Sequence, residues 1–307
     1  MLAGAALGTL PDLDVYIDFG GAVENYTYHR GFSHSLFVLA PFSALLWLML
    51  WRWWAPVRQA PFRWLAAISL ALLTHPLLDA HTAYGTQLFW PLAVAPTSWA
   101  TLFIIDPLYT LPLLVGVLVA IFRRKVGGTA LRAGLLISTL YIGWSWVAQA
   151  TVSRHVEDAL ASMQLSDAKV FLTPTRLNTL LWRVVVMTDD GHLEGFDSLV
   201  LDEGTVRFTA YPSAVDAMQD AGDIWAVNRL RWFARDFVRA RIDNDRLVIS
   251  DLRMGQEPTY VFSHVVAARG NPHWEEIPAE LLSISFADRA LAQTWDRIFN
   301  SPSAGKD

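Results

Sequence analysis

Four long apolar runs, all in the first half of the chain, restrict the possible folds more than any other feature. Each approaches the length of about 20 residues that a helix needs to cross the hydrocarbon core of a bilayer. The predicted spans are Leu36–Trp54, Trp64–Ala80, Trp99–Phe122 and Ala133–Val152. A shorter run, Met1–Leu10, is too short to span and lacks the charged start of a secretory signal. We interpret it as the tail of a helix whose beginning the chain lacks.

Composition separates this apolar half from the rest of the 307-residue chain. Only 17% of the residues are charged, against about 25% in a typical soluble domain. We therefore predict a transmembrane helical domain over residues 1–152 and a soluble domain over residues 153–307. The chain has no cysteine, so any metal must be bound by histidine and carboxylate. The net charge of −5 and the lack of a basic stripe give no indication of nucleic-acid binding.

The short loops between the spans carry an uneven distribution of positive charge. Two loops are rich in arginine, while the alternate loops, 12–35 and 81–98, contain a single Arg and no Lys. The basic residues of the rich loops are Arg52, Arg58, Arg63, Arg123, Arg124, Lys125 and Arg132. Cytoplasmic loops carry the excess of positive charge. This predicts a multi-pass membrane protein, with both histidine-containing loops and the C-terminal domain on the outer side of the membrane.

The second half shows short alternating stretches and turn residues typical of a sheet. The predicted strands are Leu181–Met187, Ser198–Leu201, Thr205–Thr209, Arg246–Ser250 and Tyr260–Ser263, with helices over Arg154–Leu165 and Ile224–Ala240. Turns are expected at residues 189–191 and 243–245, and a disordered tail after Asn300. The predicted fold is a membrane all-α bundle of about four full spans plus a short N-terminal helix. A small soluble α+β domain, dominated by an antiparallel sheet, follows it.

The end of the second span carries candidate metal ligands in the stretch THPLLDAH. His75 and Asp79 are four residues apart, which places them on one helical face. They could bind a metal ion together or simply hydrogen-bond to each other. Pro76 loosens the helix at this point, as is common where a membrane helix opens toward a site. His81 points elsewhere and is expected to support the site or to be an ordinary hydrogen-bonded residue.

Two further stretches, LPDLD and HRGFSHS, precede the first span. In an extended chain Asp12 and Asp14 would face the same side and could converge on one cation; they could equally form a turn at a helix end. His29 and His34 would need a turn, or the start of a helix, to come together, because they are five residues apart. Gly31, between them, allows a tight bend.

The same stretches carry candidates for substrate contact. Arg30 and Ser33 (or Ser35) could orient an anionic substrate or cap the following helix. The predicted metal ligands are Asp12, Asp14, His29, His34, His75 and Asp79, which would suit one divalent ion or two bridged ions. Such ligands suit Zn, Mn and Fe alike. Asp106, inside the third predicted span, is costly in a membrane and needs a partner or an interfacial position.

Taken as a set, LPDLD at 10–14, HRGFSHS at 29–35, LLTHPLLDAHTAYGTQLFWP at 72–91 and FIIDPLYTLP at 103–112 resemble one family. The chain is similar to YdjM-like proteins of the bacterial inner membrane, described as membrane-bound, metal-dependent hydrolases. The resemblance implies that this protein is a multi-pass protein of that membrane and that its outer side is the periplasmic side. PTRLNTLLW at 174–182 and DLRMG at 251–255 resemble the second half of longer members. Such members begin with a fuller helix carrying a polar motif. This chain starts after it, so either the start is misassigned or one span is lacking.

These observations predict a membrane-bound, metal-dependent hydrolase that acts on a lipid or on a lipid-linked phosphate or ester. Its partners would be membrane lipid and a small-molecule or lipid substrate, with no nucleic acid. The main alternative is a non-enzymatic membrane protein, such as a transporter or a metal-sensing receptor. Transporters tend to show internal repeats and polar residues at the bilayer midplane, whereas here the polar residues stand at the ends of the spans. A third possibility is a binding module held by a membrane anchor.

Overall fold

The computed structural model describes residues 2–201, 206–283 and 297–298. The chain forms two compact units, and each combines apolar helices with part of the C-terminal half. One unit comprises Met1–Trp99 and Ala214–Ile284, and the other comprises Ala100–Ser213 and Ser285–Asp307. The tail predicted to be disordered after Asn300 lies outside the described residues.

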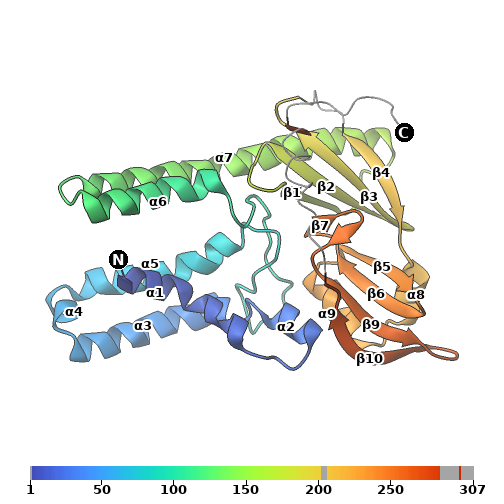
Figure 1. Cartoon of the computed structure of the whole chain (residues 1–307), viewed down its shortest axis with the longest axis horizontal. Helices are drawn as coiled ribbons and strands as arrows, with labels where there is room; N and C mark the ends of the chain where they lie inside the picture. The colour runs from blue at the N-terminus through green and yellow to red at the C-terminus, as the bar shows by residue number, and fades with distance from the viewer. Residues whose placement is uncertain (1, 202–205, 284–296, 299–307) are drawn as a thin grey trace. The chain divides into compact units, whose positions relative to one another are not determined.

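The helical part of the first unit is an antiparallel pair of long helices with short helices at its ends (Figure 1). Its elements are α1 (Leu2–Thr9), η1 (Pro11–Tyr16), α2 (Ala22–Tyr28), η2 (Phe32–His34), α3 (Leu36–Trp53), α4 (Ala55–Gln59) and α5 (Pro61–Asp79). Leu39 of α3 packs with Ile68 and Leu72 of α5. Ser43 and Ser69 lie 3.1 Å apart across the same pair. Small polar residues let membrane helices approach closely.

The C-terminal part of the first unit is an antiparallel sheet with two short helices. Its elements are α8 (Val215–Asp220), α9 (Trp225–Phe233), β5 (Val238–Asp243), β6 (Arg246–Asp251), β7 (Gly255–Gln256), β8 (Thr259–Tyr260), β9 (Ser263–Arg269) and β10 (Trp274–Leu281). The four long strands pair in the order β10-β9-β6-β5. The core of this sheet also contains Val23 and Tyr26 of α2 and Tyr84 of the loop after α5. The unit is therefore one packed body from its first helices to its last strand.

The second unit pairs two apolar helices and continues into a second antiparallel sheet. Its elements are α6 (Pro107–Phe122), α7 (Gly127–Ser162), β1 (Val170–Pro174), β2 (Leu181–Thr188), β3 (Gly191–Ser198) and β4 (Arg207–Pro212). The strands pair in the order β1-β2-β3-β4. Val152 and Val156, in the second half of α7, pack on Trp182 and Val184 of β2. One helix thus belongs to the apolar region at its start and to the sheet's core at its end.

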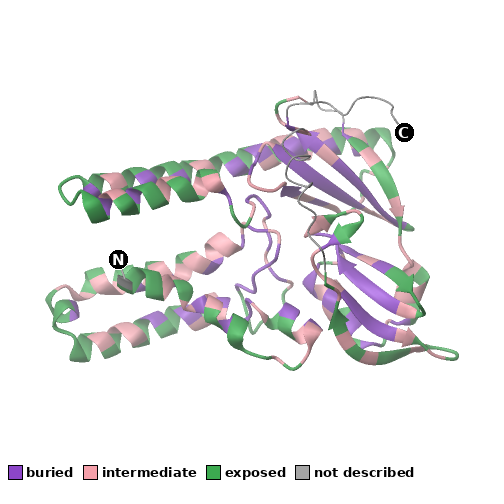
Figure 2. Ribbon diagram, in the orientation of Figure 1, coloured by how far each residue is buried: buried purple, intermediate pink, exposed green. Residues whose placement is uncertain are grey.

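Three helices in the described part of the chain are long and apolar enough to cross a membrane: α3, α5 and α7. Figure 2 shows many exposed residues along these helices and mostly buried residues along strands β2, β3, β6 and β9. Only 11% of the residues of α3, and 17% of those in the most apolar 18-residue stretch of α5, are buried. Exposed apolar surface of this extent suits lipid rather than water. The structure therefore contains apolar helices followed by a β-sheet-rich C-terminal part.

The prediction of four full spans is not confirmed, because α6 has only 16 residues. That length corresponds to about 24 Å, less than a bilayer core of roughly 30 Å. The predicted third span began at Trp99, but the helix begins at Pro107. Asp106 sets the boundary, because its carboxylate accepts hydrogen bonds from the backbone of Leu108 and Tyr109. It is the N-cap of α6 and has a structural partner.

Several boundaries in the second half also differ from prediction. The helix expected over 224–240 ends at Phe233 and gives way to strand β5, after Arg235 and Asp236 with positive φ angles of 57° and 64°. The strand expected from Ser198 to Leu201 is wrong, since β3 ends at Ser198. The helix expected over 154–165 is the continuation of α7, which runs unbroken through the predicted domain boundary. The division at residue 152 stays a prediction.

Strands β2 and β6 are confirmed where they were predicted. The segment expected as one strand at 260–263 is instead the end of β8 and the start of β9. Of the segment expected at 205–209, the structure describes a strand from Arg207 onward, β4. The predicted turns at 189–191 and 243–245 join β2 to β3 and β5 to β6. The antiparallel character is thus confirmed, but the described residues form two four-stranded sheets and one two-stranded sheet rather than a single sheet.

Candidate metal centre

The C-terminal end of α5 presents a histidine and a carboxylate on one face. His75 Nε2 lies 3.4 Å from Asp79 Oδ2, as expected for residues four apart on a helix. Pro76 lies between them inside the helix. α5 ends at Asp79, and the chain then turns into the loop 80–99. The spacing in the sequence therefore predicted this pair correctly.

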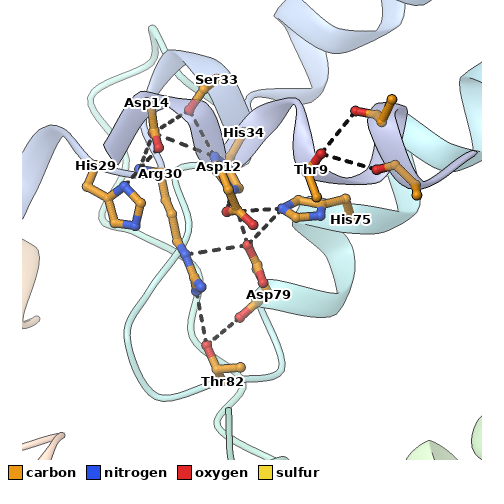
Figure 3. Close-up of polar contacts among 12 residues, drawn as sticks. Thr9, Asp12, Asp14, His29, Arg30, Ser33, His34, His75, Asp79 and Thr82 are labelled. Atoms are coloured by element: carbon orange, nitrogen blue, oxygen red, sulfur yellow. Dashed lines mark hydrogen bonds and ion pairs between the residues drawn. The ribbon is translucent and has the colours of Figure 1, made fainter. Parts of the chain in front are cut away.

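Two short 3₁₀ helices bring the other members of the cluster to this end of α5 (Figure 3). Asp12, from η1, lies with its Oδ1 3.3 Å from His34 Nε2 and 3.3 Å from His75 Nε2. His34, from η2, lies with its Nε2 3.1 Å from Asp79 Oδ2. One ligand atom from each of the four residues lies within 4.8 Å of all the others. We call Asp12, His34, His75 and Asp79 the metal centre.

The metal centre fits a divalent cation by its own chemistry. Among the described residues, His34 Nε2, His75 Nε2 and Asp79 Oδ2 are buried atoms without a hydrogen-bond partner. Buried polar atoms are normally satisfied, and a cation shared by these atoms would satisfy all three. Two imidazoles and two carboxylates also form a ligand set suited to a metal such as zinc.

Asp14 does not join the four ligands but organises the residues around them. In the 3₁₀ helix η1, with three residues per turn, Asp12 and Asp14 point in different directions, unlike in the extended chain considered above. Asp14 accepts hydrogen bonds from Ser33 Oγ at 2.5 Å and from the backbone N–H of Arg30 at 2.9 Å. Burial raises its pKa, but hydrogen bonds from His29 and Ser33 outweigh burial and lower it. Asp14 is therefore an ionised, buried anchor.

Ser33 connects this anchor to one of the ligands. Its hydroxyl donates to Asp14 and lies 2.9 Å from His34 Nδ1. A hydroxyl whose proton is given to a carboxylate can only accept from the imidazole, so His34 carries its proton on Nδ1. In the neutral imidazole Nε2 is then unprotonated, which is the form that could bind a metal. The structure thus places Ser33 between Asp14 and His34, and its predicted contact with a substrate stays a prediction.

His29 and Arg30 lie beside the metal centre. His29 Nδ1 is 2.9 Å from Asp14 Oδ1, and its ring centroid is 6.3 Å from that of His34. Arg30 has a left-handed φ of 57°, and its Nε lies 3.4 Å from Asp79 Oδ2. His29, like Asp14, lies outside the four atoms that converge, and its predicted role as a ligand stays a prediction.

The bend that joins His29 to His34 requires a glycine for steric reasons. A Cβ on Gly31 would lie 2.7 Å from the backbone oxygen of Tyr28, closer than real side chains approach. The sequence prediction of a tight bend at this glycine is confirmed by that close approach. Without it, η2 would not carry His34 back toward η1.

Three residues of the loop after α5 complete the surroundings. His81 Nδ1 lies 2.9 Å from the backbone oxygen of Leu77, and burial lowers its pKa; it is outside the metal centre. The sequence reasoning missed Thr82 and Tyr84. Thr82 accepts a hydrogen bond from Arg30 Nη1 and donates one to the Asp79 backbone oxygen. The Tyr84 ring lies 5.2 Å from the Arg30 guanidinium carbon. Their place directly after the THPLLDAH stretch was the only available signal.

Comparison with known proteins supports the membrane character of this region. A family model described as "YdjM inner membrane protein" matches residues 1–152, which contain the whole metal centre. Inner membrane protein YbcI of Escherichia coli (strain K12) is 40% identical over 91 residues, which cover 29% of this chain and 51% of that protein. Uncharacterized protein YfhP of Bacillus subtilis (strain 168) is 24% identical over 193 residues, covering 61% of this chain and 55% of that protein.

The matches span about half the length of these curated relatives. No solved structure matches the chain. The family model describes inner membrane proteins, and the matched residues contain helices apolar and long enough to cross a membrane. We conclude that this is a membrane protein. Over its residues 1–152, the chain is similar to the YdjM family of inner membrane proteins.

Proposed function

We propose that this protein is a membrane-bound, metal-dependent hydrolase. The observation that carries the proposal is the set of buried imidazole and carboxylate atoms that face one another without hydrogen-bond partners. These atoms come from η2 and α5, and Asp12 of η1 lies beside them, so the fold assembles the metal centre from three separate parts of the chain. When bound, a divalent cation of this kind activates water and polarises a phosphoryl or carbonyl oxygen. Zinc, manganese and iron all suit the ligand set.

In this proposal the protein's own residues hold the ligands and the substrate. Asp14 and Ser33 keep His34 in the tautomer with an unprotonated Nε2. Arg30 directs two of its donors to Asp79 and Thr82, and we propose that the others bind an anionic group of the substrate. A guanidinium has five such donors in a planar arrangement.

The place of the metal centre in the chain supports a lipid or a lipid-linked phosphate or ester as the substrate. His34 lies two residues before α3, and Asp79 is the last residue of α5. A site at the ends of two apolar helices meets lipid head groups first. The arginine-rich connection at the opposite end of these two helices, with Arg52, Arg58 and Arg63, supports a periplasmic position for the site.

The transporter alternative rested on Asp106, a carboxylate within a predicted span. Asp106 caps α6 and accepts a hydrogen bond from Tyr141 at 2.9 Å. This structural role leaves no specific observation in favour of transport.

Elemental analysis of the full chain, purified in detergent, tests the proposal. We expect about one equivalent of a divalent metal in the wild type and its loss in the His34→Ala/His75→Ala double variant. The matched control is His81→Ala/His273→Ala, which removes two histidines outside the metal centre and should keep the metal. Hydrolysis of chromogenic phosphodiesters and esters should follow the metal content and stop on chelation. Equal metal content in the wild type and in the His34/His75 variant would refute the proposal.

A further inference from the structure

A buried ion pair lies in the C-terminal part of the first unit, outside the metal centre. Arg253 Nη2 is 2.6 Å from Asp251 Oδ2, and the two side chains are 0% and 2% exposed. The backbone N–H of Arg253 also donates to Asp251 Oδ1 at 2.8 Å. Burying two charges is costly and does not by itself favour stability. The contacts of this pair indicate what it does.

Asp251 binds the second helix of the chain. Tyr26 of α2 donates its hydroxyl to Asp251 Oδ2 at 2.7 Å. The Tyr26 ring stacks on Phe262 with 4.2 Å between centroids and meets Phe233 edge-on at 4.8 Å. Because α2 leads directly into the HRGFSHS stretch, this contact sets the position from which that stretch begins.

The loop after α5 also packs against Tyr26 and Phe233. Tyr84 donates its hydroxyl to the Tyr26 backbone oxygen at 2.5 Å, and its ring packs against Phe233 at 5.5 Å. A Cβ on Gly85 would lie 3.2 Å from Arg253 Nη1, and Gly85 has a φ of 102°. Only a glycine lets this loop lie so close to Arg253 in that conformation.

Tyr84 also contacts two residues beside the metal centre, His29 and Arg30. Its ring meets the His29 ring edge-on at 5.5 Å, and the Arg30 guanidinium carbon lies 5.2 Å from its centroid. Arg30 in turn reaches Asp79, one of the four ligands. Contacts thus run without a gap from the C-terminal ion pair to the metal centre.

We infer that the buried ion pair of Asp251 and Arg253 positions Arg30 beside the metal centre. It acts through the two tyrosines, Tyr26 and Tyr84. These four are positioning residues, since Arg30 alone would touch the substrate. The inference rests on the proposed function for the role of Arg30, and it gives the C-terminal sheet of the first unit a part in the site. The sheet is then more than a separate binding module.

Hydrogen–deuterium exchange of the full chain in detergent, without added metal, tests the positioning directly. The variants Tyr26→Phe and Tyr84→Phe each remove one hydroxyl and keep the ring. We expect exchange in residues 26–34 and 81–88 to rise about tenfold, as for the loss of one buried hydrogen bond. Exchange in strands β5 and β6 of the same unit should stay as in the wild type, which excludes unfolding of that unit.

The matched control is Tyr260→Phe, which removes another buried tyrosine-to-carboxylate hydrogen bond, to Glu257 in the same C-terminal part. It should leave exchange in both segments unchanged. Asp251→Asn is the direct test but could destabilise the unit, so the tyrosine variants decide. Wild-type exchange rates in both tyrosine variants would overturn the inference.

Binding of inorganic phosphate to the manganese-loaded protein provides the second readout. We expect Tyr84→Phe to weaken phosphate binding about tenfold, the cost of one buried hydrogen bond, with unchanged metal content. In an Arg30→Ala background the same substitution should cause no further loss. Equal losses in both backgrounds would show a general structural effect and overturn the inference. If the wild type binds no metal, the proposed function fails, while the exchange measurement still decides the positioning.

Discussion

His264 is a single residue whose surroundings set a response to acid. Its side chain is fully buried on β9, with its ring 5.3 Å from that of Tyr26. Burial lowers the pKa of His264 to about 4, against an opposing effect of the Asp251 charge. Protonation of this imidazole is therefore resisted in the folded protein, in contrast to an exposed histidine.

The sign of the pH dependence follows from this lowered pKa. Between pH 6.5 and about 4 the unfolded chain binds a proton at His264 and the folded chain does not, so acid favours unfolding. We expect the free energy of unfolding to fall by up to about 3 kcal/mol between pH 7 and pH 4 from this residue. Denaturant unfolding in detergent of the wild type and of His264→Phe measures it. An equal pH dependence in both proteins would contradict the assignment.

Residue chemistry also explains why the predicted ligands fall into two groups. Asp12 and His34 point into the metal centre, whereas Asp14 and His29 bind each other at 2.9 Å beside it. Such neighbours orient the ligands of metal sites and are nearly as important as the ligands. Residue type and proximity in the sequence do not distinguish the two groups.

At the scale of elements, the α6–α7 pair depends on glycines at its interface. A Cβ on Gly116 would lie 2.9 Å from the Ala130 backbone oxygen. A Cβ on Gly134 would overlap the backbone carbonyl of Pro112. Small residues of this kind allow membrane helices to pack backbone to backbone.

We therefore expect Gly134→Ala to destabilise the helix pair by about 1–3 kcal/mol, because the added methyl group forces two backbones apart. Gly143→Ala is the matched control, since nothing lies within 4 Å of a Cβ at that position on the same helix. It should be neutral or stabilising by up to about 1 kcal/mol through helix propensity. Thermal unfolding in detergent compares the two. Equal effects would show that the close packing is unimportant.

For the whole molecule, the orientation in the membrane is the main prediction. The chain has no cysteine, so single cysteines can report which side each loop occupies. The positive-inside rule puts the loop between α6 and α7 in the cytoplasm and the C-terminal strands outside. A membrane-impermeant maleimide should label Gln219→Cys in intact spheroplasts and Gly128→Cys only after permeabilisation. The reverse pattern would invert the predicted topology.

Much of the helical architecture could be predicted, because the signals are local. Apolar runs of sufficient length identify α3 and α5 within a few residues of their observed ends, and they locate α7, which extends beyond the predicted span at both ends. The four-residue spacing of His75 and Asp79 defines a shared face on any helix. The start of α6 was misplaced by eight residues, because an apolar run does not reveal that Asp106 serves as its cap.

The boundaries of the strands could be predicted less well from the sequence. The helix expected to continue past Phe233 reverses at Arg235 and Asp236, and the following residues become strand β5 beside β6. Pairing with β6, the next strand of the chain, outweighs the local helical pattern there, because strand formation depends on the neighbours that a segment packs against.

Sequence alone thus specified the apolar spans, the absence of thiolate ligands and the six candidate residues around a metal. Each of these depends on composition or on spacing within one segment. Only the folded structure shows that Asp12 rather than Asp14 lies within the metal centre. It also shows that Tyr84, held by Tyr26, contacts the residues beside that centre. Both arrangements depend on how η1, η2 and the C-terminal sheet pack against the end of α5. Such packing joins residues more than 200 positions apart, as in the hydrogen bond from Tyr26 to Asp251, and no periodicity in the sequence encodes it.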